Sequence, residues 1–147
     1  MKRIAIGLLV YCALLQAGVA ELNWLTDLPK AQAKAKEENK QVLLDFTGSD
    51  WCGWCIKFNK DVLSTPEFAE YAAKNLVLVE VDFPRKKEQS TELKKANKAL
   101  GSKYNVDGYP TFVVLSKDGK EIGRQEGYAA GGPKAFITKL EEFKAKN

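Results

Sequence analysis

Cys52 and Cys55 are the residues of this chain whose types and spacing could do chemistry. They stand three positions apart in Trp51-Cys-Gly-Trp-Cys55, between an apolar run and a helical pattern. Two cysteines at this spacing, where a strand turns into a helix, place their Cα atoms near the roughly 5–6 Å that a disulfide needs. The bond can then form and break with little backbone movement, so the pair predicts a two-electron thiol-disulfide switch.

The two cysteines occupy different positions in the predicted helix. Cys52 lies at its N-terminus, where unpaired N–H groups and the helix dipole favour a thiolate. Cys55 lies one turn further in, on a stripe with Phe58 and Val62 that should face the core. We therefore expect Cys52 to attack a client disulfide and Cys55 to resolve the mixed disulfide that results.

A static disulfide and half of a metal site are the alternatives for this pair. The chain has no histidine, and its third cysteine, Cys12, lies in an N-terminal segment that should be removed. A tetrahedral zinc site is therefore short of ligands, and neither a metal nor a cofactor is expected. A static bridge across two residues would close too short a loop to add much stability. The lack of histidine also excludes Ser-His-Asp and Cys-His catalytic pairs.

Residues 1–20 have the features of an export signal. Met1-Lys-Arg3 is a basic start, the next 14 residues are almost all apolar, and Gly18-Val-Ala20 offers small residues to a signal peptidase. An uncleaved membrane anchor is the alternative, but the apolar run is just shorter than the about 20 residues that a span needs. We expect a signal peptide at 1–20, a mature domain at 21–147 and a periplasmic or secreted location.

The composition fits one compact domain. The chain has 147 residues, of which 45% are hydrophobic and 29% charged, enough for one core and too few for two. Loss of Lys2 and Arg3 with the signal reduces the 23 basic residues to 21, against 19 acidic ones. A surface of such mixed charge gives no support for nucleic-acid binding. A monomer is expected.

Strand and helix patterns alternate around the cysteine pair. Segment 83–104 is a charged loop and a polar helix whose basic residues form either a solvated face or a partner patch. Asp118-Gly119 is a strong hairpin signal. The other patterns predict strands at 41–47, 76–82, 111–116 and 121–125, and helices at 26–39, 52–63, 65–75 and from Pro133 onward. This order predicts an α/β fold with a mixed central sheet flanked by helices.

The residues from about Val42 to Phe143 resemble the thioredoxin-fold thiol-disulfide oxidoreductases. The resemblance rests on Asp45-Phe46, on the CxxC segment and on Gly108-Tyr-Pro-Thr-Phe112. Phe46-Thr-Gly-Ser-Asp-Trp-Cys52 and Glu80-Val-Asp-Phe-Pro84 point more narrowly to exported DsbH-like proteins and to the C-terminal domain of DsbD. The resemblance implies a thioredoxin fold with an expanded helical segment at 83–104, before the strand that begins with a cis-proline.

The resemblance also implies roles for residues beyond the cysteines. Pro110 matches the family's cis-proline, which faces the CxxC pair, and Tyr109 would offer backbone hydrogen bonds to an extended substrate. Trp51 and Trp54 are candidate docking residues; we expect Trp51 to pack on the domain and Trp54 to be exposed beside the thiols.

Asp45 matches the buried carboxylate that takes the proton of the resolving thiol in this family. It departs from the usual pattern, since it lies seven residues before Cys52 and no lysine stands on the strand 76–82. The match therefore requires the turn at residues 48–50 to hold one extra residue. A plain buried or edge carboxylate is the alternative.

The leading functional hypothesis is an exported enzyme that reduces or isomerises disulfides in exported proteins or small thiol compounds. A membrane thiol reductase is the expected electron donor. The alternatives are a client-binding module that uses the groove at Tyr109-Pro110, with a vestigial CxxC pair, and a dedicated electron relay. Gly53-Trp54 lacks the histidine that strong oxidants carry between their cysteines, which favours the reducing direction.

Overall fold

Two apolar runs of the sequence form the centre of one β-sheet. They are β2 (Gln41–Thr47) and β3 (Leu76–Asp82), and every residue of β2 is buried. The structure is a computed structural model that describes residues 21–146, so the predicted signal peptide lies outside the described residues. The other elements are β1 (Trp24–Leu25), α1 (Leu28–Glu38), α2 (Gly53–Phe58), η1 (Asn59–Leu63), α3 (Pro66–Asn75), α4 (Thr91–Lys103), β4 (Thr111–Leu115), β5 (Glu121–Glu126) and α5 (Gly132–Ala145).

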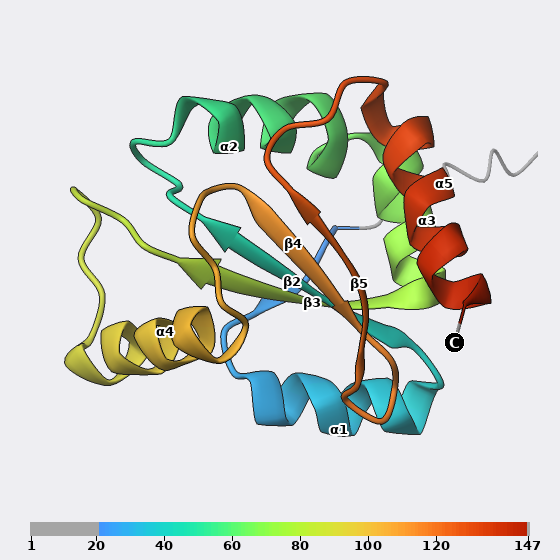
Figure 1. Cartoon of the computed structure of the whole chain (residues 1–147), viewed down its shortest axis with the longest axis horizontal. Helices are drawn as coiled ribbons and strands as arrows, with labels where there is room; N and C mark the ends of the chain where they lie inside the picture. The colour runs from blue at the N-terminus through green and yellow to red at the C-terminus, as the bar shows by residue number, and fades with distance from the viewer. Residues whose placement is uncertain (1–20, 147) are drawn as a thin grey trace, which may run out of the picture.

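The strands lie in the order β1-β3-β2-β4-β5, and the predicted mixed sheet with flanking helices is confirmed (Figure 1). β3 runs parallel to β1 and β2, whereas β4 runs antiparallel to β2 and β5. This register places Asp45 of β2 between Glu80 of β3 and Phe112 of β4. Because alternate residues of a strand point to opposite faces, these three side chains share one face of the sheet.

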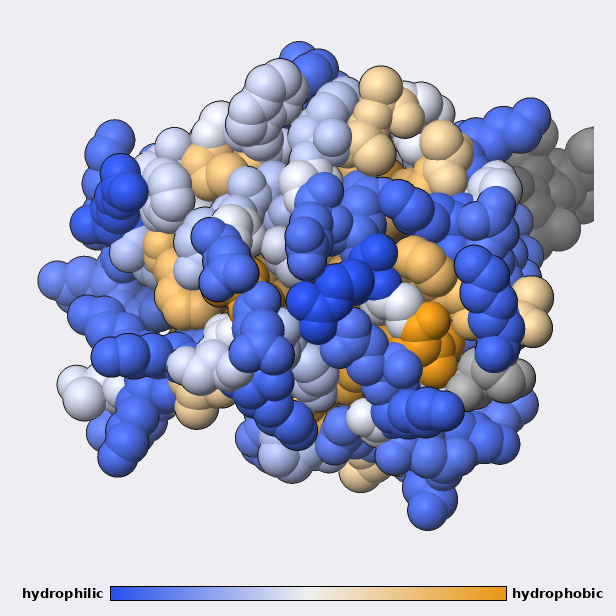
Figure 2. Space-filling model, in the orientation of Figure 1, coloured by the Kyte–Doolittle hydropathy of each residue, from blue (hydrophilic) through white to orange (hydrophobic). Residues whose placement is uncertain are grey.

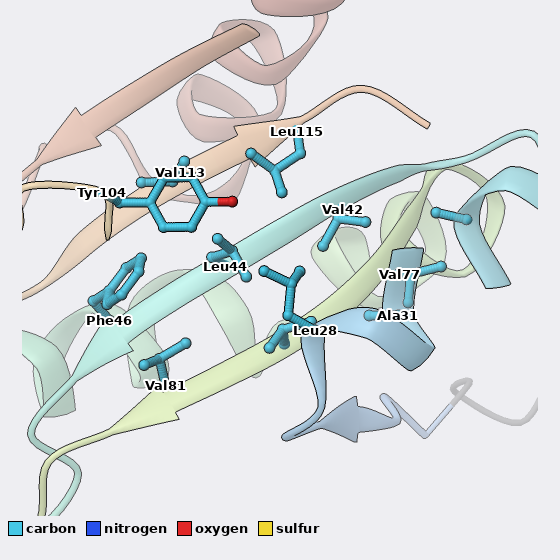
Figure 3. Packing of buried hydrophobic residues seen from close by; sticks show 12 residues of the cluster. Leu28, Ala31, Val42, Leu44, Phe46, Val77, Val81, Tyr104, Val113 and Leu115 are labelled. Carbon is cyan, nitrogen blue, oxygen red and sulfur yellow. The ribbon is translucent and has the colours of Figure 1, made fainter. Parts of the chain in front are cut away.

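Helices cover both faces of the sheet and enclose two cores (Figure 1). The first core packs α1 and the end of α4 on one face, and Figure 3 shows how side chains such as Val42, Leu44 and Phe46 fill it. The second core lies on the face of Asp45, beneath α2, η1, α3 and α5. Phe58 of α2 packs against Phe112 of β4 there, with ring centroids 4.5 Å apart. This stacking fixes the helix that carries the cysteines onto the sheet.

The predicted helix at 52–63 is confirmed in its extent, but its second half, residues 59–63, is the π-helical turn η1 and not a continuation of α2. This wider turn carries Val62 and Leu63, which are both buried in the core. The short strand β1 was not predicted, since two residues carry no periodic pattern.

Among residues 21–146 no helix combines the length and the apolar character that crossing a membrane requires. Hydrophilic side chains predominate on the face shown in Figure 2, and the apolar surface there is divided into small patches. The large apolar side chains lie mainly in the two cores; the exposed ones are Trp54 and Ile56, with 59% and 49% of their surface accessible among the described residues. Both belong to α2.

Candidate active site

Cys52 and Cys55 are joined by a disulfide at the N-terminus of α2. Their Cα atoms are 5.2 Å apart, within the range expected from the spacing. Cys52 is the N-cap residue, and its sulfur accepts a hydrogen bond from the backbone N–H of Cys55 at 3.2 Å. Little of either residue is accessible, 7% for Cys52 and 4% for Cys55. The sulfur of Cys52 thus lies where backbone donors can stabilise negative charge.

A tight turn connects β2 to the disulfide. The N–H groups of Trp51 and Cys52 both donate to the carbonyl of Gly48, at 3.2 and 2.9 Å. A Cβ atom on residue 48 would lie only 2.5 Å from the indole of Trp51, so the turn requires glycine. The turn at residues 48–51 therefore holds the one residue by which the spacing from Asp45 to Cys52 exceeds the usual one. Asp45 itself lies on β2, below α2.

The turn is fastened to the segment that follows β3. Ser49 donates hydrogen bonds from its N–H and its hydroxyl to the buried carboxylate of Asp82. The carboxylate of Asp50 accepts the three backbone N–H groups of residues 85–87, at 2.9, 2.7 and 2.7 Å. These backbone hydrogen bonds hold the pKa of Asp50 below its usual range. We call this set of contacts between residues 49–50 and 82–87 the clasp.

Trp51 extends the clasp toward Tyr109 and the start of β4. Its Nε1–H donates to the carbonyl of Phe83 at 2.7 Å, and its ring meets that of Tyr109 edge to face. The guanidinium of Arg85 lies 3.8 Å from the centre of the Trp51 ring. Trp51 thus packs on the domain, as expected. Arg85 is a cation beside the site that sequence reasoning missed, because 33 positions separate it from Cys52.

We expect Asp50→Ala to release the segment after β3 from the active-site turn. The substitution removes the acceptor of three backbone hydrogen bonds, and residues 85–87 are themselves exposed trypsin sites. Cleavage there should accelerate about tenfold or more, because proteolysis of a folded protein follows local opening. Quantifying the cleavage products over time by mass spectrometry measures this. Asp118→Ala, an exposed position in the β4–β5 turn, is the control and should leave cleavage at 85–87 unchanged.

Trp54 and Tyr109 contact different parts of the domain around the disulfide. Trp54 is exposed, and its ring centroid is 5.3 Å from that of Tyr128, in the loop after β5. Tyr109 packs between Trp51 and Phe83. The peptide bond from Tyr109 to Pro110 is cis, as the resemblance implied, and Pro110 is buried. The contact between Tyr109 and Trp51 places the start of β4 beside the active-site turn.

Asp45 lies in a pocket with Cys55, on the inner side of α2. The pocket has a volume of about 250 Å³, and Asn59, Ser49 and Glu80 also line it. Burial, followed by the charges of Glu80 and Asp82, raises the pKa of Asp45 to about 8. Its Oδ1 atom is buried and has no hydrogen-bond partner among the described residues. The pocket thus places a carboxyl group with a raised pKa beside the buried cysteine.

The sheet topology and the cysteine pair together define a class of protein, the thioredoxin-fold thiol-disulfide oxidoreductases. Comparison with known families agrees: residues 28–144 match the thioredoxin-like domain. The chain belongs to this family, and its CxxC pair marks it as an enzyme of the thiol-disulfide oxidoreductase class.

Within this class the chain is similar to DsbH. The disulfide bond reductase DsbH of Chlamydia pneumoniae is 38% identical over 122 residues, which cover 83% of this chain and 72% of that protein. A solved structure of a DsbH oxidoreductase superposes with a TM-score of 0.80 at 37% identity, covering 87% of this chain and 88% of the other. The thiol:disulfide interchange protein DsbD of Cronobacter sakazakii is 36% identical over 78% of this chain, but the match covers only 18% of DsbD.

Proposed function

We propose that this thiol-disulfide oxidoreductase is exported and that it reduces or isomerises disulfides in exported proteins or small thiol compounds. The observation that carries the proposal is the Cys52–Cys55 disulfide at the N-terminus of α2, with Asp45 in the pocket behind Cys55. The similarity to a disulfide bond reductase supports the reducing direction. The basic start, apolar run and small residues of positions 1–20 support export and a mature chain that begins at Glu21.

In the proposed reaction the client gains two electrons and the cysteine pair loses them. The thiolate of Cys52 attacks one sulfur of the client disulfide, and the other client sulfur leaves as a thiolate. The Cys55 thiol then gives its proton to Asp45, and its sulfur attacks Cys52 in the mixed disulfide. The Cys52–Cys55 bond forms as the bond from Cys52 to the client breaks, and the second client thiolate leaves. Water protonates the two released thiolates.

Asp45 serves in this scheme as the proton acceptor for Cys55. With a pKa of about 8, a minor fraction of Asp45 is ionised at neutral pH and can accept a proton, while the protonated majority can return one. It therefore acts in both directions: it takes the proton when Cys55 attacks, and it returns the proton when an upstream donor reduces the disulfide and Cys55 leaves. A membrane thiol reductase is the kind of donor that we propose.

The proposed client surface surrounds the disulfide. Trp54 offers an exposed aromatic face on one side, and Tyr109-Pro110 offers the start of β4 on the other. Trp51 supports Tyr109 from below through their ring contact. An extended client segment can pair with the backbone at Tyr109 while its cysteine meets Cys52.

We expect a reduction potential closer to about −270 mV, as in thioredoxin, than to the about −120 mV of a strong oxidase. A strong oxidase stabilises its reduced form with several donors around the nucleophilic thiolate. Here neither side chain between the cysteines is charged, so the N-terminus of α2 supplies most of the stabilisation of the thiolate. Equilibration with glutathione measures the potential, and an insulin reduction assay tests the direction. A potential near the oxidase value, or oxidation of reduced clients without reduction of oxidised ones, would reverse the proposed direction.

A further inference from the structure

The pocket behind Cys55 contains a second carboxyl group, Glu80, that the proposed reaction has not yet used. Glu80 is only partly buried, whereas Asp45 is almost completely buried. The pocket therefore connects an enclosed acid to one that reaches solvent.

The sheet register brings these two acids together. Asp45 and Glu80 are paired residues of the parallel strands β2 and β3, which lie about 4.8 Å apart in a sheet. Their side chains point to the same face, under α2. On the other neighbouring strand the partner of Asp45 is Phe112, which is buried and has no titratable group. Among the pocket residues Glu80 is thus the acid beside Asp45, and it is the more accessible of the two.

We propose that Glu80 is a positioning residue for the proton of Asp45: it shares this proton in the pocket and passes it between Asp45 and water. The inference rests on the proposed resolving role of Cys55 and adds the path by which its proton leaves. When Cys55 attacks Cys52, the proton moves from the Cys55 sulfur to the carboxylate of Asp45, then to that of Glu80, and finally to water. When a donor reduces the disulfide, the same path supplies a proton to the departing Cys55 thiolate.

The charges around the pocket favour a shared proton. Glu80 and Asp82 raise the pKa of Asp45, and burial with the charge of Asp82 also raises the pKa of Glu80. From α2 and η1, Cys55 and Asn59 face the pocket without a charge, and the turn contributes Ser49. Lys87 is the cation that acts on Glu80, and it favours the charged form. Two neighbouring carboxylates without a cation between them hold one proton as a pair.

Substitutions of Glu80 test this inference with two measurements. Glu80→Gln keeps the size of the side chain and removes its charge, and Glu80→Lys reverses the charge. In the oxidised protein, carboxyl NMR should show Asp45 titrating about one pH unit lower in Glu80→Gln and lower still in Glu80→Lys. Glu88→Gln removes an exposed acid outside the pocket and should leave the titration of Asp45 unchanged.

Reduction of the Cys52–Cys55 disulfide by dithiothreitol gives the second measurement. Relative to wild type at each pH, the rate in Glu80→Gln should be nearly unchanged at pH 6, about two-fold lower at pH 7 and about five-fold lower at pH 8, because less Asp45 is protonated when Cys55 leaves. Asp45→Asn should remove the dependence on Glu80. An unchanged titration of Asp45 in Glu80→Gln, or a rate that follows wild type throughout, overturns the inference. The NMR titration needs no client, so it separates this outcome from failure of the proposed function, which would appear as absent client turnover in the wild type.

Discussion

Cys52→Ser should abolish client reduction, with a loss of about 10³-fold or more. The thiolate is the nucleophile in disulfide exchange, and a serine hydroxyl cannot replace it. Cys52 is also the cysteine whose sulfur lies at the N-cap of α2. Turnover of an insulin-type client, followed with an excess of reductant and corrected for the uncatalysed rate, measures the loss.

Cys55→Ser is the informative companion variant, because it should stop the reaction one step later. Cys52 can still attack, but nothing resolves the mixed disulfide, so a covalent adduct with the client should accumulate and be visible by mass spectrometry. Equal adduct formation in Cys52→Ser would contradict the assignment of the two roles. If Cys52→Ser instead binds clients and supports the biological function as well as wild type does, the chain acts as a client-binding module.

The chemistry of the cysteine pair was predictable because the sequence patterns that indicate it lie close to the two cysteines in the chain. The apolar run before Cys52 and the helical stripe through Cys55 lie within a few residues of the motif, and both formed the elements that they predicted. The hairpin around Asp118-Gly119 was predicted for the same reason, since turn chemistry is short-ranged. The cis bond before Pro110 came from the resemblance alone.

The surroundings of the pair were not predictable, because they depend on contacts between distant positions. Three backbone N–H groups from residues 85–87 hold the carboxylate of Asp50, and no local pattern in the sequence indicates this contact. The missing lysine on β3 was noted, yet the sheet register was needed to show that Glu80 stands opposite Asp45. The periodicity of apolar residues predicts which face of a strand or helix a side chain occupies. It does not predict which residue, such as one 35 positions away, lies beside that side chain in the fold.

Asp45→Asn should make the oxidised protein more stable at neutral pH, by about 4 kcal/mol at pH 7. The pKa of Asp45 is about 8 in the folded protein, against an ordinary value of 3.8. Between these two values the unfolded chain is ionised at this position, while the folded protein binds a proton. Folding therefore takes up a proton, and the free energy of unfolding falls by about 1.4 kcal/mol for each pH unit from pH 4 to 8. Asparagine has no such proton to take up.

The pH dependence distinguishes this cause from a general packing effect. The stabilisation by Asp45→Asn should be absent below about pH 4, grow through the neutral range and level off above about pH 8. Urea unfolding of both oxidised proteins across this range measures it, and the exposed Asp107→Asn serves as the control that should follow wild type. A gain that is the same at pH 3 and pH 8 would contradict a raised pKa of Asp45.

Since a domain of this size is stable by only about 5–15 kcal/mol, retaining an acid here costs a large share of the stability. Such a cost is expected where a buried carboxyl group is kept for proton exchange with Cys55.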